Sequence, residues 1–150
     1  MRAMPSTPLE KAKRIFGEQK AHCSQAIFAS YGEQLGLGKV DFETCMKISS
    51  AFSGGIAGSG NVCGAITGAL MALGLKYGSY GYATEVNEIA VKLFDEFKSL
   101  NGSIICRELI NHDLITDEDV KQAFGNGSFD NCPKFVEDTA VILEKLLEIP

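Results

Sequence analysis

The chain has 150 residues, a length that suits one domain able to bury a core without disulfides or metals. With 45% apolar and 22% charged residues and a mean hydropathy of +0.05, its composition is that of an ordinary soluble protein. The formal net charge of −5 and the scattered Lys and Arg residues argue against a nucleic-acid surface and against a patch for anionic membranes.

No targeting or membrane segment is expected. The N-terminal region lacks the apolar run of a signal peptide. The longest mainly apolar run, residues 62–75, contains three glycines and is shorter than the roughly 20 residues of a membrane span, so it predicts a buried core helix. Five cysteines without a CxxC pair exclude a thioredoxin motif, c-type haem attachment and the usual zinc-knuckle spacing. These features predict a cytoplasmic protein whose cysteines meet only through the fold.

The chain begins with a helix signal. Thr7, Pro8 and Glu10 form a capping box with proline at the first helical position, and Gly17 is expected to end this helix near Phe16. The helix therefore has a sequence signal at each end.

Two further helices are expected before residue 53. One begins within residues 22–24, shows an apolar face at helical spacing, and is expected to end at Gly36 or Gly38. Asp41 then caps a helix over residues 42–52, whose apolar positions again repeat at helical spacing.

A glycine loop, residues 54–60, leads into the next helix. Its glycines are Gly54, Gly55, Gly58 and Gly60. The helix that follows begins at Cys63 and is expected to end at Gly74 or Gly78. Such a loop before a helix N-terminus can hold an anion or a close ligand, although the Gly-Lys-Ser/Thr of a P-loop is missing. The candidate cofactor-binding residues are Gly58, Gly60 and Gly64.

Four more helices are predicted in the second half of the chain. The segment from Tyr80 to Leu100 carries a continuous apolar stripe and stops at Gly102. Ser103 can cap a short helix over residues 104–111. The remaining two helices start at residues 116–119 and 131–133, the first ending near residue 124 and the second running toward the C-terminus. No segment shows the alternation of a strand, so we expect an all-α single domain, residues 1–150, built as a bundle of seven or eight helices.

Four of the five cysteines fall within the first turn of a predicted helix. These are Cys23, Cys63, Cys106 and Cys132, called the four cysteines below. Free N–H groups and the dipole at a helix N-terminus stabilise a thiolate, so a lowered cysteine pKa is expected at these positions. Cys45 instead lies on the apolar stripe of its helix, which predicts core packing.

Small residues line one face of the Cys63 helix. Gly64 and Gly68 each cost up to about 1 kcal/mol relative to alanine in a helix interior. This cost predicts close approach of another backbone, either a helix that bears a second cysteine or the same helix in a homodimer. His22, which adjoins Cys23, is favoured as an exposed residue at a helix start over a role as base or metal ligand.

The cysteine pattern resembles a known family. The segments HCSQAIFASYG, SGGIAGSGNVCGAITGALMALGLKYG, CRELI and CPKFV occur in the order found in the redox-active proteins named for their C_GCAxxG_C_C pattern. The resemblance covers roughly residues 22–147. The CGAxxG core stands at residues 63–68, and the other three family cysteines correspond to Cys23, Cys106 and Cys132.

The resemblance implies a small helical protein with four functional cysteines and a redox role that has no assigned reaction. The family is also similar to the cysteine-bearing domain of split-Soret cytochromes, where such cysteines are associated with an iron centre. Because this chain lacks CxxCH, covalent haem is not expected. Family members often accompany transporter genes, which implies a transporter-associated redox partner.

Three functions are therefore open at this point. The first is thiol–disulfide or electron-transfer chemistry, with Cys63 as the attacking thiolate and Cys23, Cys106 or Cys132 as the resolving cysteine, which would make the protein a thiol-dependent oxidoreductase. In the second, the four cysteines are ligands of an iron–sulfur cluster or zinc. The third is a small helical interaction module with structural cysteines.

Overall fold

A computed structural model describes residues 7–35, 40–81 and 84–148. Within these residues the chain forms eight α-helices, one 3₁₀ helix and a single isolated β-bridge, which confirms the all-α prediction. The elements are α1 (Pro8–Gly17), α2 (Cys23–Leu35), α3 (Phe42–Ser49), η1 (Ser50–Phe52), α4 (Gly64–Tyr77), α5 (Thr84–Asn101), α6 (Cys106–Leu109), α7 (Asp117–Gly125) and α8 (Cys132–Leu146).

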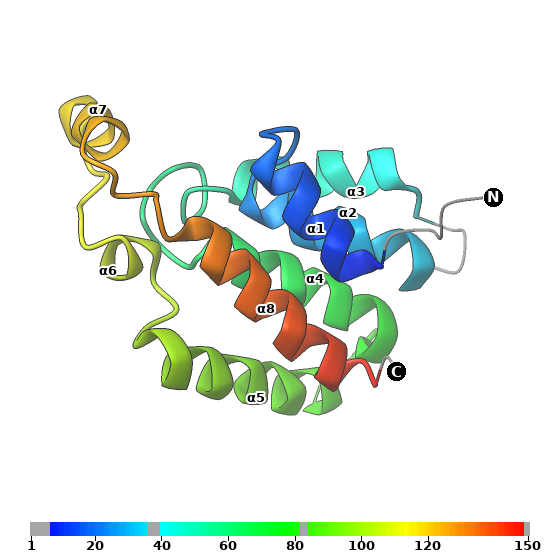
Figure 1. The fold of residues 1–150 in the computed structure, drawn as a ribbon. Helices are drawn as coiled ribbons and strands as arrows, with labels where there is room; N and C mark the ends of the chain where they lie inside the picture. The colour runs from blue at the N-terminus through cyan, green and yellow to red at the C-terminus, as the bar shows by residue number, and fades with distance from the viewer. Residues whose placement is uncertain (1–6, 36–39, 82–83, 149–150) are drawn as a thin grey trace.

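The bundle is organised around α2, α4 and α8. Helix α2 packs against α1, α3 and α4, while α8 packs against α1, α4 and α5. As a result α1–α3 lie on one side of α4 and α8, and α5 lies on the other (Figure 1). The largest fully buried side chains include Tyr31, Phe97, Ile66, Leu73 and Leu143. None of the helices in the described parts of the chain has the length and apolar character needed to span a membrane.

Helices α6 and α7 lie at the end of the bundle where α8 begins (Figure 1). They form a second, smaller core of Cys106, Ile110, Leu114 and Ala123, with Phe129 packed against it. The main core lies between α1, α2, α4, α5 and α8. The cysteine-bearing helix starts are therefore placed at the junction of two apolar clusters.

The local signals predicted most helix ends correctly. The capping box of Thr7 and Glu10 is present at α1, and Thr116 with Asp119 forms another at α7. Asp41 Oδ1 accepts from the N–H of Thr44 at 2.7 Å, as expected for the cap of α3. The two glycines expected to end α2, Gly36 and Gly38, lie outside the described residues.

Three expectations were wrong in detail. The helix expected over residues 42–52 is α-helical only to Ser49 and continues as η1. Leu100, expected on the buried stripe of α5, is 57% exposed. The short helix expected from residue 104 begins at Cys106, because the segment before it pairs with the chain before α4, where Ile105 forms a β-bridge to Val62.

Candidate cysteine site

The four cysteines begin four helices, as the sequence predicted. Cys23, Cys106 and Cys132 are the first residues of α2, α6 and α8, and Cys63 is the N-cap of α4. All of them line one cavity of about 920 Å³, called the cysteine cavity below. The fold therefore brings together residues that are 26 to 109 positions apart, counted from Cys106 to Cys132 and from Cys23 to Cys132.

Cys45 is separate from this cavity, as expected. Its side chain is fully buried in the main core, beneath Gly32 of α2. A Cβ added at Gly32 would lie 2.6 Å from Cys45 Sγ, so glycine is what allows the two helices to approach here. The sequence prediction of core packing for Cys45 is confirmed.

Close packing of α4 on α2 brings Cys23 and Cys63 to the same place. A Cβ added at Gly64 would lie 2.3 Å from Cys23 Sγ, and one added at Gly68 would lie 2.6 Å from the carbonyl oxygen of Ser24. The small-residue face of α4 is thus covered by the helix that bears a second cysteine. The sequence left two neighbours open for this face, and in the structure the face packs against α2, the helix that bears Cys23.

The glycine loop is a left-handed turn. Five consecutive residues, from Gly54 to Gly58, have φ between +53° and +73°, and two of them, Ile56 and Ala57, are not glycines. Left-handed backbone costs a residue with a Cβ roughly 1–2 kcal/mol, so such a run persists only where its surroundings hold it. The loop closes on itself, since the N–H groups of Gly60 and Asn61 donate to the carbonyls of Gly54 and Gly55.

The same loop fixes Cys106 beside Cys63. The N–H of Cys63 donates to the carbonyl of Ile104 at 2.8 Å, and the N–H of Cys106 donates to the carbonyl of Asn61 at 2.6 Å. On the other side of the loop, a Cβ added at Gly55 would lie 2.7 Å from Cys106 Cβ. Two segments that are more than forty residues apart are therefore held in register, with the β-bridge between Val62 and Ile105 one residue before each cysteine.

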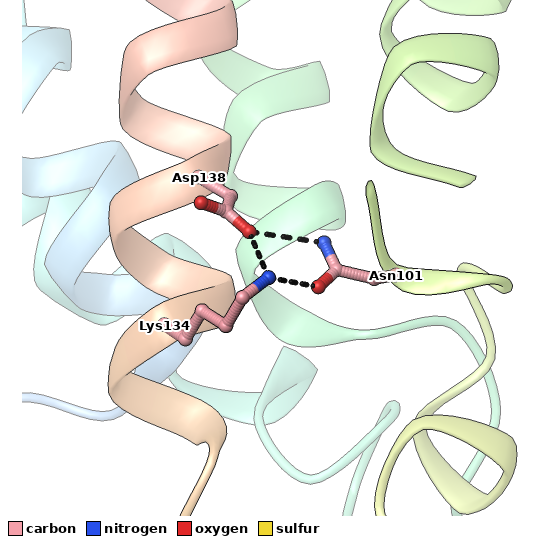
Figure 2. Close-up of polar contacts among 3 residues, drawn as sticks. All are labelled: Asn101, Lys134 and Asp138. Atoms are coloured by element: carbon pink, nitrogen blue, oxygen red, sulfur yellow. Dashed lines mark hydrogen bonds and ion pairs between the residues drawn. The ribbon is translucent and has the colours of Figure 1, made fainter. Parts of the chain in front are cut away.

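A polar network holds the start of α8 to the end of α5. Lys134 Nζ donates to Asn101 Oδ1 at 2.6 Å and to Asp138 Oδ2 at 2.7 Å, and Asn101 Nδ2 donates to the same oxygen of Asp138 at 3.2 Å (Figure 2). Asn101 is the last residue of α5, and Lys134 lies two residues after Cys132. The network thus links the helix that begins with Cys132 to the segment that leads to Cys106.

The expectation of lowered cysteine pKa values is wrong. Burial raises the pKa of each of the four cysteines, and for Cys63, Cys106 and Cys132 the nearby Cys23 raises it further. The pKa of Cys106 is raised to about 11 and that of Cys132 to about 12. Helix starts do supply N–H groups, but the desolvation of a thiolate among apolar side chains outweighs them.

Cys23 has the largest set of backbone donors among the four. Burial is the first cause of its raised pKa, but the backbone N–H groups of Gly54, Ser24, Gly64 and Cys23 itself act in the opposite direction. Cys63 has two such groups, from Ala65 and Ile66. The donors around Cys23 come from the starts of two helices and from the glycine loop, so they converge only in the folded protein.

The candidate cofactor-binding glycines are placed differently from one another. Gly58 and Gly64 line the cysteine cavity. Gly60 lies against Arg107 instead, and its carbonyl accepts from the backbone N–H and the guanidinium of that residue. Binding of an anion by the loop stays a prediction. His22 lines the cavity but is exposed, and its backbone N–H donates to Gln25 Oε1.

The sequence reasoning missed the apolar residues that complete the cavity. Phe124 and Phe129, whose ring centroids are 4.9 Å apart, line it together with Leu109 and Leu114. Their only signal in the sequence was an apolar character shared with ordinary core residues. Their position beside the cysteines depends on how the segment between α6 and α8 folds back.

The donor set as placed does not fit a metal ion. Among residues 7–35, 40–81 and 84–148, no three side chains of the His, Cys, Asp and Glu type are arranged to hold one. All five cysteines lie in these ranges and are free thiols.

Comparison with known proteins gives one family. The model of the family described as "Putative redox-active protein (C_GCAxxG_C_C)" matches residues 21–146, which include the four cysteines and the glycine loop. No curated protein and no solved structure matches the chain.

Proposed function

This chain belongs to the C_GCAxxG_C_C family, and we propose that it carries out reversible dithiol–disulfide chemistry with the cysteines of its cavity. The observation that carries the proposal is that four cysteines from four separate helix starts line one cavity, while the fifth lies apart in the core. In the forward step two S–H bonds break and one S–S bond forms. Two electrons and two protons leave for an acceptor.

Cys23 is the attacking sulfur in this proposal, in place of Cys63. Attack requires a thiolate, and although burial raises the pKa of Cys23, backbone N–H groups from three segments act against this rise. After burial, Cys23 is the next cause of the raised pKa of each of the other three, so it lies near all of them. A protein in which Cys23 can meet several partners is suited to passing a disulfide from one pair to another.

Cys63 is the favoured first partner. Gly64, which follows it, leaves the space that Cys23 Sγ occupies, so the two helix starts are in direct contact. Cys106 and Cys132 are then the second pair, since Cys106 belongs to the smaller core formed by α6 and α7 and Cys132 packs against that core.

The test is to oxidise the reduced protein with diamide, a general thiol oxidant, and to locate the disulfides by peptide mass spectrometry. We expect a bridge between Cys23 and Cys63 that dithiothreitol reverses, and its loss in Cys23→Ser. Cys45→Ala is the matched control and should leave the bridge unchanged. Failure to form any reversible bridge among the four cysteines would overturn the proposal.

Metal or iron–sulfur binding by the same cysteines is the competing function, and a separate measurement decides it. Protein purified without oxygen is examined by absorption spectroscopy and elemental analysis. Zinc or iron at one or more per chain, lost in Cys23→Ser, would replace the dithiol proposal with a metal site. A metal content well below one ion per chain would support the dithiol chemistry.

A further inference from the structure

The cysteine cavity has a second wall that the dithiol chemistry does not use. Its volume of about 920 Å³ lies within the range of small-molecule sites, about 300–1,000 Å³. The segment from α6 to α8 supplies a largely apolar wall, with Leu109, Ile110, Leu114, Val120, Phe124 and Phe129. A disulfide bond between two cysteines needs none of these side chains, so they indicate a space for an apolar molecule beside the sulfurs.

The charges around the cavity disfavour an anionic molecule. Neither Lys nor Arg occurs among the described residues that line it, and apart from the cysteines its ionisable side chains are His22 and Asp130. Lys134, two residues after Cys132, is held by Asn101 and Asp138 (Figure 2). A substrate that carries carboxylates or phosphates, such as oxidised glutathione, therefore finds no cation in this lining.

An aromatic surface is left uncovered at the edge of the cavity. Phe124 lines the cavity but is 75% exposed, and its ring packs at 4.9 Å from that of Phe129. Ile115, which follows the cavity-lining Leu114, is 78% exposed. Large apolar side chains exposed together beside a cavity mark a binding surface. Phe124 and the four cysteines line the same cavity, so an apolar ring that covers Phe124 lies at the edge of the space that the sulfurs share.

We propose that the oxidant of this site is an uncharged quinone, an inference that rests on the dithiol function proposed above. The step balances without a further reactant. Two thiols and one quinone give one disulfide and one hydroquinone, so two S–H bonds break, one S–S bond forms and two O–H bonds form on the quinone oxygens. The two electrons and two protons released by the thiols are those that the quinone takes up.

The probe is duroquinone, whose ring carbons are all substituted, so that thiol addition to an unsubstituted position does not compete. Reduced protein is mixed with it in the absence of oxygen, and hydroquinone and disulfide are both measured. We expect one hydroquinone for each disulfide. At equal concentration, duroquinone should oxidise the protein at least about tenfold faster than oxidised glutathione, which carries the wrong charge for this lining.

Variants at Phe124, at the edge of the cysteine cavity, test whether the quinone binds beside this side chain. Phe124→Ala should slow oxidation by duroquinone about tenfold and leave oxidation by diamide unchanged, since one lost apolar contact in a pocket has an effect of this size. Phe124→Leu keeps an apolar side chain on α7, so its rate of oxidation by duroquinone should lie between the rates of Phe124→Ala and the unmodified protein. Tyr80→Ala removes an exposed aromatic residue outside the cavity and is the matched control.

The outcomes separate the two proposals. If diamide forms the disulfide but duroquinone is no faster than oxidised glutathione, the quinone inference is overturned and the dithiol function stands. The inference is likewise overturned if Phe124→Ala and Phe124→Leu, both folded by circular dichroism, react with duroquinone at the unmodified rate. If neither oxidant forms a disulfide, the dithiol function itself fails.

Discussion

The sulfur of Cys23 occupies the space that a side chain at position 64 would need. A Cβ added to Gly64 would lie 2.3 Å from Cys23 Sγ and 3.1 Å from the carbonyl oxygen of Phe52. Atoms that are not bonded do not approach so closely in a packed interior. The glycine that follows Cys63 is thus a condition for the meeting of the two cysteine-bearing helices.

Gly64→Ala should therefore destabilise the protein and displace Cys23. We expect a loss of about 1–3 kcal/mol in the free energy of unfolding, as for other overpacked interiors, measured by urea denaturation of the reduced protein. Gly74→Ala is the control on the same helix, because a Cβ there meets nothing within 4 Å. It should stabilise the protein by up to about 1 kcal/mol. Equal effects of the two substitutions would contradict the assignment of Gly64.

The left-handed glycine loop predicts opposite effects at two neighbouring positions. Ala57, with φ of +53° and an exposed side chain, has a strained backbone, so Ala57→Gly should raise the free energy of unfolding by about 0.5 kcal/mol. Gly55, with φ of +73°, has no room for a Cβ beside Cys106. Gly55→Ala should cost about 2 kcal/mol or more and change the rate at which Cys106 is alkylated. Thermal unfolding and peptide mass spectrometry measure the two effects.

The raised cysteine pKa values predict lower stability of the reduced protein at alkaline pH. An unfolded cysteine has a pKa near 8.5, whereas burial and then the nearby Cys23 raise the pKa of folded Cys106 to about 11 and that of folded Cys132 to about 12. Above about pH 8.5 the folded state thus binds more protons than the unfolded state, so stability falls as pH rises. The loss of stability is at most about 1.4 kcal/mol per pH unit for each thiol, because each thiol contributes at most one proton to the difference between the two states.

Urea midpoints at about pH 8 and about pH 10 measure this dependence. The control is the double variant Cys106→Ala and Cys132→Ala, which lacks two of the thiols and should lose less stability over the same interval. An identical slope in both proteins would show that other groups cause the loss.

The network at the start of α8 should hold Cys132 in place. Asn101→Ala removes the amide that bonds both Lys134 and Asp138, at a cost of about 1 kcal/mol. Faster hydrogen exchange is expected in the first turn of α8, together with a changed alkylation rate of Cys132. Lys145→Ala is the control, since Lys145 pairs with Glu96 across the same two helices at a largely exposed site, where such a pair contributes about 0.2–1 kcal/mol. No difference in exchange between the two variants would contradict this role of Asn101.

Local signals in the sequence were enough for most of the fold. The caps at Thr7, Asp41 and Thr116 act within one turn of chain, and the apolar periodicity of the long helices depends on neighbouring residues only. The caps therefore predicted the starts of α1, α3 and α7, while other local signals placed the four cysteines within the first turn of the remaining helices. The start of α6 was not predicted correctly, because the hydrogen bonds of residues 104–107 are made with residues 60, 61 and 63, more than forty positions earlier.

The chemistry at the four cysteines depends on tertiary structure. The sequence by itself determined which residues begin the helices, and that position alone favours a thiolate. Only the fold decided that apolar side chains of the main core and of the α6–α7 cluster surround the sulfurs, and burial then raises the pKa of every one of them. Desolvation depends on everything that lies within a few ångströms of the charge. Most of those neighbours come from distant parts of the chain, so no pattern around a single cysteine could have revealed them.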